Sequence, residues 1–180
     1  MTRYMPISIA LLLAGTSITA AAQTPPPPPP AEAKTQAEPY VTAAGRSDLY
    51  EINSSQVVLE KSQNPAIRRY ADMMIKHHQK TTAATLAAAT KAGLTPPPPA
   101  LDPGATASIN ELQLASAGDV DRLYLAQQVP AHRAALDLHQ GYGSGGDQAP
   151  LRATAKKAVP IVRQHLAEAE RMQQGAGGGM

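Results

Sequence analysis

The chain has 180 residues, a formal net charge of +2, and no cysteine, phenylalanine or tryptophan. The missing cysteines exclude disulfides, thiolate metal sites and cysteine nucleophiles. The near-neutral charge and the missing stacking rings argue against nucleic acid as a partner.

Residues 1–22 have the pattern of an export signal. Arg3 gives a short positive start, an apolar run follows from Ile7 to Ile18, and Ala20 and Ala22 form a small-x-small cleavage site. The run is shorter than the roughly 20 residues that a membrane span needs. The sequence therefore predicts export to a bacterial periplasm or cell envelope, with no transmembrane span in the mature chain. An uncleaved N-terminal anchor is the alternative.

Residues 23–39 are predicted to be a Pro-rich disordered linker. Pro25–Pro30 favours an extended polyproline II rod, and the residues that follow have little to bury. The segment is either a spacer from an envelope tether or a disordered tail.

The first half of the remaining chain predicts a helical hairpin. Residues 40–62 keep apolar side chains at a three-four spacing, which predicts a helix. Asn64 and Pro65 then predict a helix start, with Asn as N-cap and Pro in the first turn. That second helix is expected to end near Gly93, before Pro96–Pro99. The short turn between the two helices predicts that they are antiparallel.

The second half predicts another hairpin after a long connection. Residues 94–118 form this connection and contain a short helix over about 106–116. Asp119 is predicted to cap a third helix that ends at the Gly-rich run 141–146, and the fourth helix is expected from Pro150 to Gln174.

Two hairpins joined by one long connection are the layout of ferritin-like bundles. No segment has the period-two pattern of a strand. The predicted fold class is therefore all-α, an antiparallel ferritin-like four-helix bundle over residues 40–174. A Gly-rich tail follows over residues 175–180.

Each of the four predicted helices places one metal-capable side chain on or beside its apolar stripe: Glu51, His78, His132 and His165. One such residue from each helix is what a metal or ligand site inside a bundle requires. At about 1.5 Å per residue, Glu51 and His78 lie at depths within roughly one turn of each other. The same count predicts that His132 and His165 differ in depth along the bundle by about 9 Å.

Two more histidines and two prolines lie near these positions. His77 is about 100° around the helix from His78, so it is expected to flank the site or face solvent. His139 lies about 10 Å beyond His132 on the same side, where it either extends a polar seam or meets water. Pro130 and Pro160 are predicted to kink the third and fourth helices.

The residues available favour some chemistries over others. A di-iron bundle needs Glu-x-x-His on two helices, but Ile75 and Val162 stand three residues before His78 and His165. Three imidazoles and one carboxylate suit a single Zn, Cu, Ni or Fe ion better, and an export compartment favours Cu or Zn. The alternative is that each histidine is satisfied by hydrogen bonds alone. Neither a nucleophile elbow nor a phosphate loop is present in the sequence.

Six short segments occur in a fixed order: Asp48-Leu49-Tyr50-Glu51, Asn64-Pro65-Ala66-Ile67, Met74-Ile75-Lys76-His77-His78, Gly118-Asp119-Val120-Asp121, Ala131-His132-Arg133-Ala134, and Val159-Pro160 followed by His165-Leu166. Together they resemble the family known as domain of unknown function 4142, over residues 40 to about 172. The resemblance implies an exported, ferritin-like helical protein in which Glu51, His78, His132 and His165 match recurrent polar positions. Asn53 stands where a second acidic residue is usual, which disfavours a two-carboxylate site.

The leading hypothesis is an exported, non-catalytic bundle that binds a metal ion or a small ligand through some of these four residues. The rival is a structural or envelope-stress protein whose buried His and Glu side chains only hydrogen-bond to one another. A metal-dependent oxidase or peroxidase is the third reading, and the missing second carboxylate argues against it.

Overall fold

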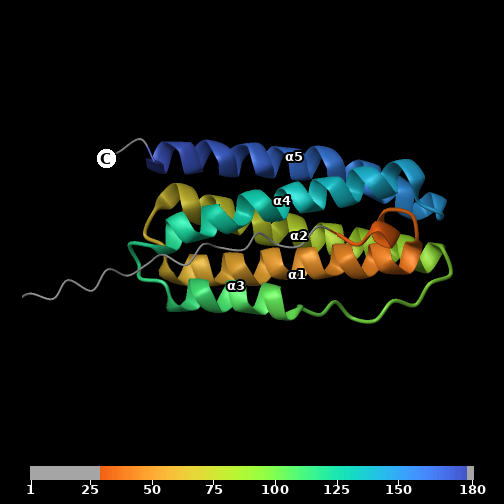
Figure 1. Ribbon diagram of the computed structural model, residues 1–180, viewed down its shortest axis with the longest axis horizontal. Coiled ribbons are helices and arrows are strands. Elements are labelled where there is room, and N and C mark those ends of the chain that lie inside the picture. The colour runs from red at the N-terminus through yellow and green to blue at the C-terminus, as the bar shows by residue number, and fades with distance from the viewer. Residues whose placement is uncertain (1–28, 178–180) are drawn as a thin grey trace, which may run out of the picture.

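The computed structural model describes residues 29–177, and these residues are helical and contain no strand (Figure 1). The elements in chain order are the short 3-10 helix η1 (Ala31–Lys34), α1 (Ala37–Lys61), α2 (Pro65–Lys91), α3 (Pro103–Leu114), α4 (Val120–Gly145) and α5 (Ala149–Gly177). The predicted all-α class is confirmed. The predicted export signal over residues 1–22, the first part of the predicted linker (23–28) and the end of the predicted tail (178–180) lie outside the described residues. Residues 175–177, predicted to belong to the tail, are the last residues of α5.

The four long helices lie side by side (Figure 1). α1 packs on α2 and α4 packs on α5, while α2–α5 and α1–α4 contacts join the two hairpins. The connection after α2 runs back along the bundle, through α3, to the start of α4 (Figure 1). Within the described part of the chain, no helix has both the length and the apolar character of a membrane span. The narrower assignment to the ferritin-like class stays a prediction.

The helix starts follow from local chemistry. The Asn64 side chain accepts a hydrogen bond from the Ala66 amide at 2.9 Å, and Pro65 occupies the first turn of α2, as predicted. Asp102 caps α3 in the same way through the Ala105 amide at 2.7 Å. Its other carboxylate oxygen lies 3.1 Å from the Arg46 guanidinium, which ties α3 to α1.

As predicted, α4 ends within the run 141–146, but it continues past the first glycine of that run to Gly145. A Cβ at Gly141 would come within 2.9 Å of the Lys34 side chain, and one at Gly143 within 3.2 Å of Lys156. These glycines allow close packing rather than ending the helix. Tyr142 between them is fully buried and anchors this last stretch.

The predicted linker also ends earlier than expected, because residues 31–39 belong to the fold. Ala33 is fully buried in η1, and α1 begins at Ala37 rather than near Tyr40. Lys34 forms an ion pair with Asp137 of α4 at 2.6 Å. Small alanine faces can pack closely against the end of α4, so this segment is ordered without any large apolar side chain.

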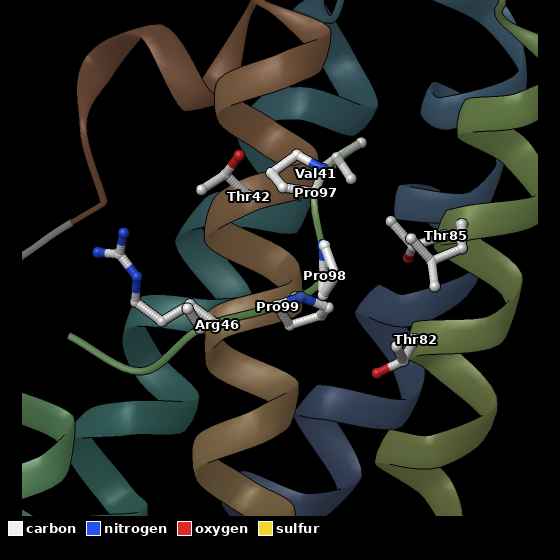
Figure 2. Close-up of a pocket in the computed structure, with 11 residues that line it drawn as sticks. Val41, Thr42, Arg46, Thr82, Thr85, Pro97, Pro98 and Pro99 are labelled. Atoms are coloured by element: carbon white, nitrogen blue, oxygen red, sulfur yellow. The ribbon is translucent and has the colours of Figure 1, made fainter. Parts of the chain in front are cut away.

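The Pro-rich connection lies against the first hairpin. Figure 2 shows Pro97, Pro98 and Pro99 against α1, with Thr82 and Thr85 of α2 across a hollow of about 200 Å³. Gly45 makes this contact possible, since a Cβ there would come within 3.0 Å of Pro99. The connection therefore covers the outer face of the α1–α2 pair.

Two apolar clusters fill the bundle, one toward each end. One surrounds Tyr70, Met74 and Tyr124, and the other surrounds Tyr40 and Tyr142. Between them along every long helix lies a layer of buried polar side chains: Asp48, Glu51, His78, Gln128, His132 and His165. Buried polar groups need partners, so this layer is the candidate functional site.

Candidate metal centre

Three of the four predicted site residues meet in the middle of the bundle. His78 of α2, His132 of α4 and His165 of α5 each offer one ligand atom, and these atoms lie within 4.8 Å of one another. The ring centroids are 5.5 to 5.9 Å apart. The three residues are 4%, 1% and 1% exposed, so the cluster is shut off from solvent. We refer to these residues as the inner histidines.

His132 and His165 lie closer in depth than the sequence predicted. Because α4 continues to Gly145, His132 stands 13 residues before its end, and His165 stands 16 residues after the start of α5. The difference of three residues corresponds to about 4.5 Å along the helix axis. Pro130 and Pro160 lie inside these helices, and the helices continue through both.

One nitrogen of each inner histidine already has a partner. His78 Nδ1–H donates to Asp48 Oδ1 at 2.7 Å, and His132 Nδ1–H donates to the Gln128 carbonyl at 2.9 Å. His165 Nε2 shares a hydrogen bond with His77 Nδ1 at 2.8 Å. Such contacts fix the ring orientation and the tautomer, as the outer partners of metal-bound histidines do.

The other nitrogen of each ring is buried and has no hydrogen-bond partner among the described residues: His78 Nε2, His132 Nε2 and His165 Nδ1. Three buried acceptors without partners cost free energy. All three belong to the rings of one cluster, and a chance arrangement does not account for that. A transition-metal ion accepts all three lone pairs at once. Imidazole nitrogens bound to one ion at about 2.0 Å lie roughly 3.4 Å apart, so only a small movement of the rings is needed.

Asp48 is the part of this site that sequence reasoning missed. It is 5% exposed, and besides His78 it accepts hydrogen bonds from Thr81 at 3.0 Å and Thr82 at 2.9 Å. The signal was present, because Asp48 lies three residues before Glu51 and shares its helix face. Its carboxylate binds His78 Nδ1 and so leaves Nε2 as the nitrogen that can bind a metal ion.

Glu51 lies beside the inner histidines and is not grouped with them. Its Oε2 accepts a hydrogen bond from Gln128 Nε2 at 2.6 Å, and its Oε1 is 3.7 Å from His132 Nδ1, the nitrogen that is also bonded to the Gln128 carbonyl. The similar depth of Glu51 and His78 led us to expect that they face each other, but the hydrogen-bond partner of His78 is Asp48. Helix depth alone could not choose between two carboxylates on one face.

Comparison with known proteins places this chain in a family. A family model described as "Domain of unknown function (DUF4142)" matches residues 22–172. The chain belongs to the DUF4142 family. The resemblance seen in the sequence is thereby confirmed. No curated protein matches the chain.

Two solved structures are similar to this DUF4142 domain. The crystal structure of a DUF305 fragment from Deinococcus radiodurans has a TM-score of 0.67 and 16% identity, covering 83% of this chain and 99% of the fragment. The structure of CopM in the Cu(I)-bound form has a TM-score of 0.67 and 14% identity, covering 79% of this chain and 99% of CopM. At these identities the similarity establishes the fold alone.

Burial sets the charge state of the DUF4142 site. Desolvation lowers the pKa of His132 to about 3 and that of His165 to about 2, with further lowering by neighbouring histidines. Desolvation also acts on His78, but its hydrogen bond to Asp48 and the Asp48 charge outweigh it and raise the pKa. Desolvation raises the pKa of Glu51 to about 7. His132 and His165 are therefore neutral at physiological pH, the form that binds metal.

The remaining two histidines of the DUF4142 domain also have partners. His77, expected at the flank or in solvent, is half-buried and bonded to His165. His139 extends the buried polar seam toward the other end of the bundle. It is 6% exposed, and its Nδ1 lies 3.1 Å from the Tyr40 hydroxyl. Desolvation lowers the pKa of His139 to about 4.

Proposed function

We propose that this DUF4142 domain is an exported, non-catalytic metal-binding bundle in which His78, His132 and His165 hold one transition-metal ion. The observation that carries the proposal is that each of the three histidines of the 4.8 Å cluster has one buried nitrogen without a partner among the described residues. The export signal pattern over residues 1–22 supports a role in the periplasm or cell envelope.

Copper(I) fits this site best. Imidazole nitrogens suit Zn, Cu, Ni and Fe, and three neutral ligands add no charge of their own. The Asp48 carboxylate neighbours the site through His78, and desolvation raises the pKa of Glu51 to about 7, which favours its uncharged form. Little negative charge then faces the ion, and this favours a monovalent ion over a divalent one. The similar fold of CopM, solved in its Cu(I)-bound form, supports the same choice. Zn(II) would require a fourth ligand and an ionised Glu51.

The structure favours this proposal over a purely structural polar seam. In a seam that only hydrogen-bonds, each inner nitrogen would be paired, as the outer nitrogens of the same rings are. An oxidase or peroxidase is less well supported, because such chemistry needs an open ligand position that a substrate can reach. Here the three ligands are at most 4% exposed.

Metal analysis of untagged protein tests the proposal. Wild-type protein equilibrated anaerobically with excess Cu(I) and then desalted is expected to retain one copper per chain, because three imidazoles converge on one point. His132→Leu is expected to retain less than about a tenth of that amount, since it removes a ligand and leaves two.

His139→Leu is the matched control, because it removes a buried histidine from the same helix outside the cluster. It should retain copper like the wild type. Equal and negligible copper in all three proteins, with Zn(II) giving the same result, would favour the hydrogen-bonded seam instead.

A further inference from the structure

The inner histidines pose a problem of access. All three are buried, and two of their neighbours, Asp48 and Glu51, are 5% and 1% exposed. An ion that reaches the centre must therefore pass a side chain that touches both the cluster and the surface. His77 is in that position, since it is half-buried and its Nδ1 lies 2.8 Å from His165 Nε2.

His165 connects this outer position to the inner one. Its Nδ1 is one of the three unpaired nitrogens of the cluster, while its Nε2 contacts His77. The two rings are stacked, with centroids 5.1 Å apart and an angle of 21° between their planes. The Tyr70 hydroxyl donates to the His165 carbonyl at 3.2 Å and so holds the backbone of α5 at this residue. The His165 ring lies between the inner histidines and His77.

A surface hollow lies on the same side of the bundle. It measures about 240 Å³ and is formed between α2 and α5, with Tyr70, Met73, Glu168 and Met172 in its wall. Met73 is one turn before His77 on the same helix face, and Glu168 is one turn after His165. Thioether sulfurs are soft ligands that suit Cu(I). The wall also contains Arg69 and Arg171, and Arg171 is paired with Glu168 at 3.1 Å.

We infer that His77 and His165 form an outer metal site, next to this hollow, through which Cu(I) enters and leaves the inner histidines. The inference rests on the proposed function, because it assigns the path to the same buried centre. It adds a second, transient site with two nitrogen ligands, one of them on the His165 ring, whose other nitrogen belongs to the inner site.

Cu(I) moves from the outer site to the inner site without any change of oxidation state. In the outer site, His77 Nδ1 and His165 Nε2 hold the ion, and His165 carries its proton on Nδ1. In the inner site, His165 Nδ1 releases its proton and binds the ion, while Nε2 takes up one proton from half-buried His77 and donates it in the hydrogen bond to His77 Nδ1. The ring therefore carries one proton before and after the transfer. Two nitrogens on one ion lie about 3 to 4 Å apart, so the 2.8 Å contact must open slightly, and half-buried His77 can withdraw.

His77→Gln in the full chain tests this path, because the glutamine oxygen can still accept the His165 Nε2–H bond but glutamine is a poor copper ligand. Stopped-flow exchange of Cu(I) with a colorimetric chelator gives the rates of loading and release. Both are expected to fall by at least about tenfold. The Kd, measured by competition, is expected to stay within about threefold of the wild-type value.

Asp48→Asn is the contrasting variant, because Asp48 positions His78 without lying on the path. It is expected to weaken the Kd by about 10- to 100-fold, with faster release and unchanged loading. His77→Gln exchanging at wild-type rates would overturn the inference, and so would His77→Gln behaving like Asp48→Asn. A wild-type protein that takes up no Cu(I) would overturn the proposed function and this inference with it, before any variant is compared.

Discussion

Saturating Cu(I) is expected to raise the melting temperature of the metal-free protein by about 10 °C. A ligand that binds only the folded state stabilises it by about 4 kcal/mol when present at 1,000 times its Kd. For a domain of this size, each kcal/mol shifts the melting temperature by roughly 2 to 5 °C. The effect should be large because the ion also satisfies three buried nitrogens that otherwise lack partners.

Two variants separate this effect from general stability. His132→Leu should melt at the same temperature with and without Cu(I), because the ligand set is broken. His139→Leu should change the melting temperature of the metal-free protein but keep the full Cu(I)-dependent rise. Differential scanning fluorimetry under anaerobic conditions measures both. A rise of equal size in wild type and His132→Leu would place the copper elsewhere on the chain.

The metal-free protein is expected to lose stability steeply as the pH falls below about 6.5. The folded-state pKa values of His132, His165 and His139 are lowered to about 3, 2 and 4, chiefly by desolvation. Below the unfolded value of about 6.5, the unfolded chain binds protons that the folded chain does not. Stability therefore falls with pH across this window.

Glu51 acts in the opposite sense. Desolvation raises its folded-state pKa from 4.5 to about 7, so between these values the folded chain binds one more proton than the unfolded chain. Stability from this group falls as the pH rises from 4.5 to 7. His78, with its raised pKa, also favours the folded state at low pH. Between pH 4.5 and 6.5, the three histidines make the unfolded chain bind about three more protons, and Glu51 makes the folded chain bind about one more. The unfolded chain therefore binds about two more protons in total. The free energy of unfolding then falls by roughly 2 to 3 kcal/mol for each pH unit of acidification.

Urea unfolding at pH 5.0, 5.5, 6.0 and 6.5 measures this slope. Since small domains are stable by about 5 to 15 kcal/mol, two pH units are enough to unfold much of the metal-free protein. His139→Leu should lower the slope by about 1.4 kcal/mol per pH unit, because one titrating group is removed. A stability that is flat between pH 5 and 6.5 would mean that these histidines are protonated in the folded state.

The helices could be predicted from the sequence because their signals are local. Apolar periodicity located the four long helices, and Asn64 with Pro65 identified the start of α2. The exact end of α4 within the run 141–146 could not be predicted. The sequence does not distinguish a glycine that permits close packing from a glycine that ends a helix. Gly141 is packed against Lys34, a residue that had been assigned to a linker.

The site could be predicted only in part. One histidine on the apolar face of each of three helices was enough to identify His78, His132 and His165. Which carboxylate would face His78 depended on helix rotation, and Asp48 and Glu51 differ there by less than one turn. The role of His77 depended on the distance between α2 and α5, which no local pattern contains.

The central claim is that three imidazoles, and no carboxylate, hold one metal ion in the middle of the bundle. X-ray absorption spectroscopy of the Cu(I)-loaded protein tests this directly. We expect a shell of three nitrogens at about 2.0 Å, with the outer-atom scattering typical of imidazole. A shell dominated by sulfur, or a nitrogen shell unchanged in His132→Leu, would contradict it.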